Sequence, residues 1–347
     1  ILNNVKNGCS FNDHAVLYRM NAQSNTIERA FIQAGIPYKV FGGMKFYDRK
    51  EIKDVIAYLS VMNNNNDILR LKRIINEPKR GIGDATLTML EEISMDLNIS
   101  PLEVMRNASD YPVLSKKSAI LKNVAKMFDY LSNFAENDDF NKIIDEVLDK
   151  TGYYSFIKNM GDEGVNRMEN INELKSTMSA YANDTENPTL NGFLEEISLY
   201  TDVDKLDENS DSVVMMTIHS SKGLEFPNVF VVGMEDGIFP SMRSLDDENS
   251  IEEERRLAYV AYTRAKERLY LSSAAQRMLF GTTTRNFTSR FVKEIDQNLL
   301  DKIDNTVKYE SSKPVVTAVN SIPLQKQLAK SKSNEFKNNL EFNVGER

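Results

Sequence analysis

The chain has 347 residues, of which 41% are hydrophobic and 27% charged, and a formal net charge of −8. This composition is typical of an ordinary soluble chain with enough apolar material for one large domain or two smaller ones. No apolar run approaches the roughly 18–20 residues that a membrane helix needs, and the residues show no signal-peptide pattern. The single cysteine excludes an internal disulfide framework and, with only two histidines beside it, leaves little for a zinc site.

The acidic total argues only mildly against nucleic acid as a partner, because binding follows local rather than total charge. A lone cysteine is typical of the reducing cytosol, and we expect a cytoplasmic location. The chain opens with Ile1 in the middle of an element, so we expect it to be a fragment of a longer protein.

Residues 1–43 predict the beginning of an α/β unit. The run 14–19 is short and apolar and predicts a strand. Residues 21–24 predict a cap for a helix that continues to about Ala34, and 37–41 predicts a second strand. The apolar face of the helix is predicted to consist of Ile27, Ala30, Phe31 and Ala34.

From Met44 onward the pattern changes to helices, which continue to about residue 200. Their apolar residues recur at helical spacing and are most simply core. We find no catalytic pattern in this region. The acidic segment 202–211 then predicts a linker back to strands.

The densest basic cluster of the chain lies within this helical region and ends in Gly81, Ile82 and Gly83. A Gly-x-Gly turn that enters a helix exposes backbone N–H groups at the positive end of the helix dipole, which suits a phosphate. The alternative, and the commoner role of such a turn, is a tight connection between helices. The adjacent charges favour DNA. The basic residues are Arg70, Lys72, Arg73, Lys79 and Arg80.

Two apolar runs after the linker, 213–216 and 229–232, predict buried strands with a polar loop between them. A helix is predicted at about 252–267. Arg264 lies seven residues after Leu257 and therefore on the apolar face of that helix. A guanidinium that points toward the protein needs an anionic partner. That partner is either an internal carboxylate, the commoner arrangement, or a phosphate bound outside the domain.

Several long stretches of this sequence resemble one protein family. Residues 217–240, TIHSSKGLEFPNVFVVGMEDGIFP, and 252–271, EEERRLAYVAYTRAKERLYL, resemble motifs V and VI of the superfamily 1A DNA helicases of the UvrD/Rep/PcrA type, most of all its PcrA branch. Residues 17–43 resemble motif IVa, and PKRGIG at 78–83 resembles the GIG motif of subdomain 2B. The resemblance covers about residues 1–297, and it matches the second half of such a helicase.

The resemblance implies a nucleotide role for two residues. Arg264 would sense the γ-phosphate of ATP from the second RecA-like lobe, and Glu225 would hold the ribose. The sequence contains no G-x-x-x-x-G-K-[ST] and no acidic pair in a Walker B arrangement. ATP with Mg²⁺ would therefore be bound mainly by the N-terminal lobe, and we expect this chain alone not to hydrolyse ATP.

The resemblance also implies contacts with DNA. The GIG turn, with Lys79, Arg80, Gly81, Ile82 and Gly83, would grip duplex DNA. Without the resemblance, Asn21 is equally a helix N-cap, the 217–222 loop an ordinary turn, and Phe280 a packing residue. Where the family often has a histidine in its base pocket, this chain has Ser241. The residues implied to contact single-stranded DNA are Asn21, Thr217, His219, Lys222 and Phe280, the last through a pocket for an unstacked base.

Together these patterns predict an α/β fold in which a RecA-like P-loop NTPase lobe, without its own Walker A loop, carries a large all-helical insert. The first segment of the lobe is 1–43 and the second is 206–297. The insert is 44–205, and a flexible linker follows at 298–347. The lobe and the insert resemble subdomains 2A and 2B.

The predicted function is that of the C-terminal half of an ATP-dependent 3′–5′ DNA helicase or translocase in DNA repair and replication. The implied partners are single-stranded DNA, single-strand/duplex junctions, the N-terminal lobe of the same protein, and repair or replication proteins, with no membrane. One alternative is a non-enzymatic DNA- or protein-binding regulatory module derived from such a helicase. Another is a helicase–nuclease subunit of the RecB/AddA kind, against which the lack of a carboxylate cluster in the tail counts.

Overall fold

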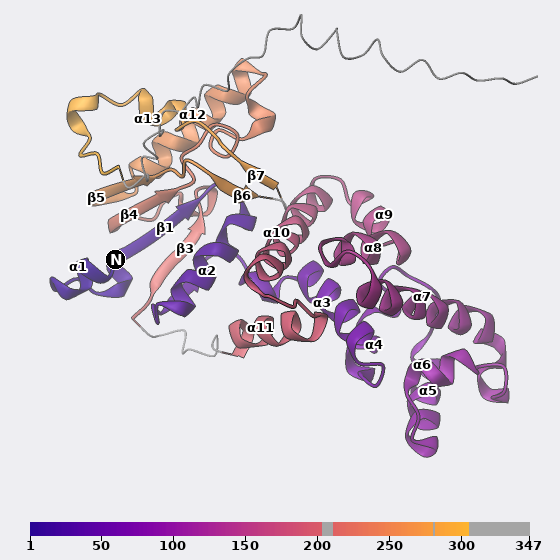
Figure 1. Ribbon diagram of the computed structural model, residues 1–347. Coiled ribbons are helices and arrows are strands. Elements are labelled where there is room, and N and C mark those ends of the chain that lie inside the picture. Colours follow the sequence, from indigo (N-terminus) through magenta and orange to yellow (C-terminus); the bar gives the residue numbers. More distant parts are fainter. Residues whose placement is uncertain (203–210, 280–281, 305–347) are drawn as a thin grey trace, which may run out of the picture. The chain divides into compact units, whose positions relative to one another are not determined.

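A five-stranded parallel sheet organises the α/β part of the computed structural model, which describes residues 1–202, 211–279 and 282–304 (Figure 1). The strand order is β2-β3-β1-β4-β5, and every neighbouring pair is parallel. The three apolar runs predicted as strands at 14–19, 213–216 and 229–232 are confirmed as β1, β3 and β4. The strands are β1 His14–Tyr18, β2 Tyr38–Val40, β3 Val213–Thr217, β4 Phe226–Val232 and β5 Ala265–Ser272.

Helices cover both faces of this sheet. Helix α2, Ser24–Gln33, packs on one face and buries Phe31 there. Helix α12, Glu248–Tyr262, packs on the other face through Ala258 and Ala261. Strands that are buried on both faces have no polar alternation, which is why β1 and β3 read as continuous apolar runs.

The predicted buried face of α2 is only partly correct. Ala30 and Ala34 are exposed. The residues of α2 that are buried are Ser24, Asn25, Glu28 and Phe31. The reason is tertiary, because the polar groups of α2 face helix α10 and the segment before α3, which supply their hydrogen-bond partners.

The described helices between β2 and β3 share one apolar core. Residues 1–301 form one compact unit, which contains both this core and the sheet. The helices are α3 Lys50–Asn63, α4 Ile68–Ile74, α5 Asp84–Leu97, α6 Pro101–Arg106, α7 Ser118–Asn137, α8 Ile143–Lys150, α9 Tyr153–Lys158, α10 Asp162–Asp184 and α11 Leu190–Asp202.

The helix predicted at 252–267 ends earlier than expected. Helix α12 stops at Tyr262, and β5 begins at Ala265, opposite Phe226 of β4. Arg264 therefore lies in the connection rather than on the helix, and the seven-residue spacing from Leu257 does not determine its direction. Pairing with β4 overrides the helical pattern because it completes the sheet.

The remaining described elements are short, and they include an antiparallel hairpin of β6 and β7. Phe280 and the predicted linker beyond residue 304 lie outside the described residues. These elements are α1 Leu2–Lys6, β6 Arg277–Leu279, β7 Thr282–Thr284 and α13 Arg290–Lys293.

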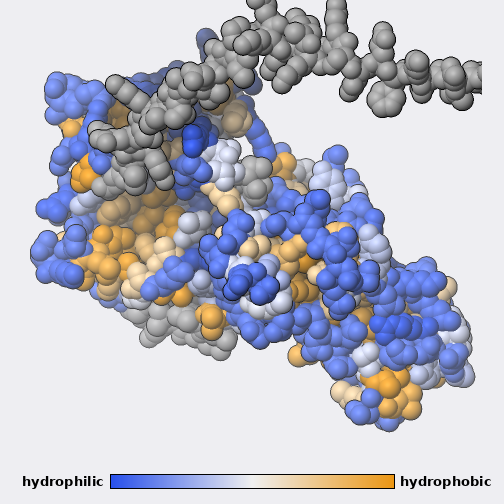
Figure 2. All heavy atoms as spheres, viewed as in Figure 1, coloured by the Kyte–Doolittle hydropathy of each residue, from blue (hydrophilic) through white to orange (hydrophobic). Residues whose placement is uncertain are grey.

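Polar side chains cover most of the visible surface of the helical region, and apolar atoms gather at the α5 end (Figure 2). Met95 and Leu97, at the end of α5, are 69% and 52% exposed. Among the described helices, none combines the length and the apolar character needed to cross a membrane.

Candidate nucleotide and nucleic-acid interface

The carboxyl ends of the parallel strands bring two candidate segments to one edge of the sheet. In α/β sheets this edge is where ligands bind. Tyr18 at the end of β1 is paired with Thr217 at the end of β3, and the amide of Ile218 donates to the Tyr18 carbonyl at 2.9 Å. The Asn21 segment and the 217–222 loop therefore begin side by side.

The 217–222 loop is a turn held by its own hydroxyl groups. The Thr217 hydroxyl accepts from the amide of Ser220 at 3.2 Å and lies 2.9 Å from the Ser220 hydroxyl. The Ser221 hydroxyl donates to the Ile218 carbonyl at 2.7 Å. His219 and Lys222 project as exposed side chains, and Lys222 has no ion-pair partner in the part of the chain that the structure describes.

A second turn approaches this loop from the end of β2. Gly42 has φ +70°, and a Cβ atom there would lie 3.2 Å from the Ser220 hydroxyl oxygen. Phe41 beside it extends the edge strand, because its amide donates to the Met215 carbonyl at 2.8 Å, and it is 48% exposed. Sequence reasoning missed Phe41 as a candidate, although an aromatic residue directly before a Gly-Gly turn at a strand end is a usable signal.

Asn21 is exposed and is not the helix cap that its sequence allowed. The residue preceding α2 is Gln23, whose side-chain oxygen accepts from the amides of Arg19 and Met20 at 3.0 and 2.9 Å. The carbonyl of Asn21 accepts from Arg49 at 3.1 Å. Its side-chain amide has no hydrogen bond within the described residues, so the N-cap alternative is wrong and the amide is available to a ligand.

An ion pair that the sequence analysis missed fixes α12 to the same edge. Arg19 donates from Nε and Nη2 to the Glu254 carboxylate, with a shortest distance of 2.7 Å, and Glu254 is 5% exposed. The Ser244 hydroxyl also donates to Glu254, at 3.3 Å. Ser241, the position that departs from the family pattern, shares a 2.8 Å hydrogen bond with Ser244 and so belongs to this network.

The Arg19–Glu254 ion pair influences the pKa of His219. Partial burial lowers the pKa of His219, the charge of Arg19 lowers it further, and Glu254 opposes both. The imidazole is therefore neutral at pH 7, and it can contact a ligand by hydrogen bonding or stacking rather than by charge.

Arg264 and Glu225 lie at the opposite, amino-terminal ends of β4 and β5. The amide of Phe226 donates to the Arg264 carbonyl at 2.9 Å. Because Asn228 is level with His14, Phe226 lies beyond the start of β1, whereas Thr217 is level with its end. The structure thus separates the two nucleotide candidates from the DNA candidates by the length of the sheet.

The guanidinium of Arg264 is half-buried and is held by neutral groups. Nε donates to the Val260 carbonyl at 3.0 Å, Nη1 to the Leu224 carbonyl at 2.9 Å, and Nη2 to the Thr263 hydroxyl at 3.1 Å. No carboxylate among the described residues pairs with it, so the prediction of an internal ion pair is wrong. Glu225, next to Leu224, is exposed and likewise has no described partner.

Most charged side chains of the predicted basic cluster form ion pairs or hydrogen bonds within the chain. Lys72 pairs with Glu91 at 2.5 Å, and Arg73 pairs with the buried Asp54 at 2.7 Å. Lys79 is exposed without a described ion-pair partner. The cluster therefore offers far less free charge than its sequence predicts.

Arg80 points inward, contrary to the expected outward contact. Its guanidinium donates to the carbonyls of Ile74, Ile75 and Thr151 and to the Tyr58 hydroxyl, at 2.9 to 3.1 Å. The carbonyl groups of Ile75 and Thr151 have no other donor among the described residues, which explains this orientation.

The 81–83 turn is held by a residue that the sequence analysis did not single out. The Asn76 side chain accepts from the amides of Arg80 and Ile82, at 3.3 and 3.1 Å, and donates to the Ile82 carbonyl. Ile82 is buried, whereas Gly81, with φ +73°, and Gly83 are exposed with open space around them. Gly83 precedes α5 without a side-chain cap, and the amides of Asp84 and Ala85 have no acceptor among the described residues.

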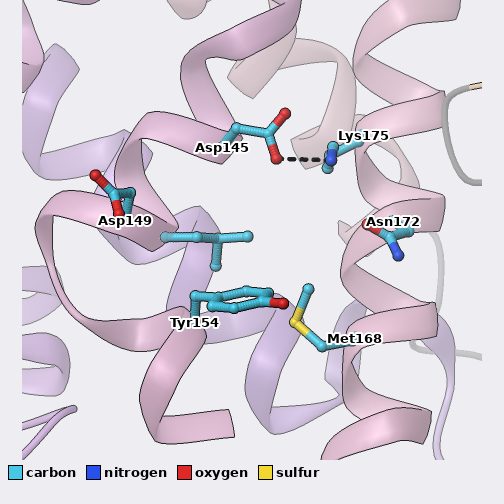
Figure 3. A pocket seen from close by; sticks show the side chains of 7 residues that line it. Asp145, Asp149, Tyr154, Met168, Asn172 and Lys175 are labelled. Carbon is cyan, nitrogen blue, oxygen red and sulfur yellow. Dashed lines mark hydrogen bonds and ion pairs between the residues drawn. The ribbon is translucent and has the colours of Figure 1, made fainter. Parts of the chain in front are cut away.

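A hollow of about 440 Å³ lies in the helical region between α8, α9 and α10 (Figure 3). Its charged groups are partly satisfied by one another, because Lys175 pairs with Asp145 at 2.7 Å. Tyr154 and Met168 form its apolar side.

No group of three or more potential metal ligands occurs in the described ranges, so no Mg²⁺ site is found among them.

Comparison with known proteins decides the family. The model of the UvrD-like helicase C-terminal domain matches residues 1–276. The chain belongs to the UvrD-like helicases. It is 42% identical over 309 residues to the ATP-dependent DNA helicase PcrA of Staphylococcus epidermidis and 41% identical over 309 residues to that of Staphylococcus aureus. Each match covers 87% of this chain and 42% of the relative.

The predicted resemblance is thereby confirmed: this UvrD-like chain corresponds to the C-terminal half of a PcrA/UvrD-type helicase. It spans less than half the length of the curated relatives that it matches. The mixed α/β fold with a parallel sheet and many helices agrees with this family.

Proposed function

We propose that this chain is the C-terminal half of an ATP-dependent 3′–5′ DNA helicase or translocase, acting in DNA repair and replication. The sheet and its covering helices form the second RecA-like lobe, and α3 to α11 form a domain inserted into it. The other lobe, with a phosphate-binding loop, would be supplied by the rest of such a helicase, since this chain spans 42% of that relative.

One observation carries the nucleotide role. Carbonyl groups orient the guanidinium of Arg264, and no carboxylate among the described residues pairs with it. Such a group is suited to stabilise negative charge that develops during phosphoryl transfer. Glu225 follows Leu224, the carbonyl of which holds Arg264, and this proximity supports its proposed contact with the ribose.

Bound Mg²⁺–ATP would supply the transferable phosphoryl group and the metal charge, and the other lobe would hold most of it. Arg264 would act on it as an arginine finger from this lobe, and Glu225 would accept a hydrogen bond from a sugar hydroxyl. Alone, the chain would not hydrolyse ATP, since it contains no phosphate-binding loop.

The carboxyl edge of the sheet is the proposed path of single-stranded DNA. Asn21, Thr217 and His219 offer uncharged polar groups, and Lys222 offers a free cation. Phe41 adds an exposed ring for base stacking, which tolerates any sequence. Phe280 remains a proposed base-pocket residue from the family resemblance alone.

The 81–83 turn is the proposed contact with duplex DNA at a junction. The free N–H groups at the start of α5 and the exposed Lys79 suit a phosphate. Arg80 would support this contact indirectly, by holding the segment in place.

The decisive test is DNA-stimulated ATP hydrolysis by the full-length protein. Arg264→Ala should lower the turnover number by about a thousandfold or more while ATP binding persists. Arg268→Ala, a nearby exposed arginine on β5, serves as the matched control and should retain activity. Equal activity of Arg264→Ala and the parent would remove the catalytic role. No DNA-stimulated activity in the parent would favour the non-enzymatic regulatory module.

A further inference from the structure

Helix α10 meets α2 through polar rather than apolar groups. Asn170, Glu173 and Thr177 recur at intervals of three and four residues and are 4–5% exposed, so they form one buried polar stripe. The neighbouring stripe of α10, which includes Ile171 and Leu174, belongs to the apolar core of the helical region.

Glu173 lies at the centre of this contact. Its Oε1 accepts from the side-chain amide of Asn25 at 3.3 Å and from the hydroxyl of Thr26 at 3.2 Å. The Asn25 amide also donates to the Thr177 hydroxyl at 2.9 Å. These bonds join α10 to the helix that covers the sheet.

Two buried atoms in the contact lack a hydrogen-bond partner in the described structure, and both are acceptors. They are Oε2 of Glu173 and Oδ1 of Asn25. A buried ionised carboxylate with an unsatisfied oxygen is costly, and so is an unpaired amide oxygen. A proton on Glu173 would neutralise the first and supply a donor to the contact that contains the second.

Two cations that act on Glu173 are each paired with another carboxylate. Arg29 of α2 pairs with Glu196 at 2.8 Å, and Arg277 of β6 pairs with the buried Glu235 at 2.8 Å. Both charges act on Glu173 only from a distance.

Arg49 also interacts electrostatically with Glu173, and the other charged groups around the contact have hydrogen-bond partners of their own. Arg49, which precedes α3, donates to Asn170 and to the Ser24 hydroxyl. Glu51 of α3 accepts from Asn170 at 2.6 Å, and Glu28 of α2 accepts from the amide of Phe46. From α9, which packs on the apolar side of α10, Tyr153 donates to Asp54.

We propose that Glu173 is a proton-dependent latch, in which the protonated carboxyl group holds α10 against α2 and loss of the proton loosens this contact. Burial raises the pKa of Glu173 from 4.5 to about 7, against the opposing effects of Asn25, Thr26, Arg277 and Arg29. The latch therefore changes state near neutral pH. It is independent of the proposed ATP and DNA roles.

The direction of the pH effect follows from proton linkage. The folded chain retains the proton between pH 4.5 and about 7, whereas the unfolded chain has lost it. Stability contributed by Glu173 is therefore complete below pH 4.5 and is lost as pH rises through about 7. Glu173→Gln resembles the protonated form at every pH, because its amide both donates and accepts.

The test compares urea unfolding of the chain at several values between pH 5 and 8. Relative to Glu173→Gln, the folding equilibrium constant of the wild type should fall by up to about tenfold per pH unit toward pH 7 and then level off. Glu163→Gln, an exposed glutamate of the same helix, should follow the wild type. A wild type and a Glu173→Gln variant with the same pH dependence would overturn the proposal.

A second measurement does not depend on the stability of any variant. The Glu173 side-chain carbon of ¹³C-glutamate-labelled protein, assigned by its absence in Glu173→Gln, should titrate near pH 7. Amide exchange in α2 and α10 should rise over the same range, after correction for intrinsic exchange. Titration near 4.5 would show an ionised carboxylate throughout, and it would exclude the latch.

Discussion

Arg264 and Arg80 carry the same guanidinium, and the groups around each decide what it can do. Both donate to backbone carbonyls. Arg80 uses its donors on three carbonyls and one hydroxyl inside the helical region. Arg264 directly precedes β5, and no described carboxylate pairs with its guanidinium, which is why we propose it as the phosphate contact.

Replacing Arg80 tests its internal role. Arg80→Ala should lower the free energy of unfolding by about 2–3 kcal/mol, because it leaves the carbonyl groups of Ile75 and Thr151 without donors. Lys79→Ala, at the exposed neighbouring position, should change it by less than about 0.5 kcal/mol. Urea unfolding at pH 7 measures both, and equal stability of the two variants would contradict the inward role of Arg80.

Of Lys79 and Arg80, Lys79 is the residue that we propose to contact DNA. Lys79→Glu should weaken binding to a single-strand/duplex junction and reduce the steepness of its salt dependence by about one ion or more. Binding to single-stranded DNA without a junction should change little. If only the affinity for single-stranded DNA falls, the assignment of the 79–83 segment to duplex DNA is wrong.

Helix α12 connects the two candidate interfaces. Glu254, in its N-terminal half, holds Arg19 at the carboxyl edge of the sheet, and Arg264 follows its last turn at the opposite end. A displacement of this helix would therefore reach both ends of β4 and β5. This arrangement is a physical route by which nucleotide and DNA contacts can be coupled.

The anchoring of α12 can be measured by removing Glu254. Glu254→Ala should lower the free energy of unfolding by about 3 kcal/mol, because Arg19 then loses its buried partner. The adjacent Glu253 pairs with Arg256 on the exposed side, and Glu253→Ala should cost less than about 1 kcal/mol. Indistinguishable unfolding curves for the two variants would argue against the anchor.

The turn before α5 allows a similar paired test. Gly81 has φ +73°, where a side chain costs about 1 kcal/mol, whereas Gly83 has an ordinary extended conformation. Gly81→Ala should therefore destabilise the chain more than Gly83→Ala. Thermal unfolding of both variants gives the comparison, and the reverse order would mean that the turn rearranges.

At the scale of the whole chain, the expected behaviour is DNA binding without catalysis. The chain contains all the proposed DNA contacts, but its sequence has no phosphate-binding loop. The isolated chain should bind single-stranded DNA with a salt-dependent affinity and should hydrolyse no ATP above background. Hydrolysis by highly purified chain that disappears in Arg264→Ala would show a complete active site here.

Local pattern predicted the strands β1, β3 and β4 and the helical character of the region from α3 to α11, and the resemblance of long motifs predicted the family. Buried strands and amphipathic helices follow from the spacing of neighbouring residues, and long motifs identify relatives. The placement of the α12 end was wrong, because pairing between β4 and β5 is not a local property.

Only the tertiary structure decided the states of individual polar side chains. The neutral partners of Arg264 include Leu224, forty residues away in sequence, and Arg80 reaches Thr151. Glu173 meets Asn25 across 148 residues, and this contact is what desolvates its carboxyl group. Charge, protonation and availability depend on which distant groups surround a side chain, and a sequence pattern contains no such distances.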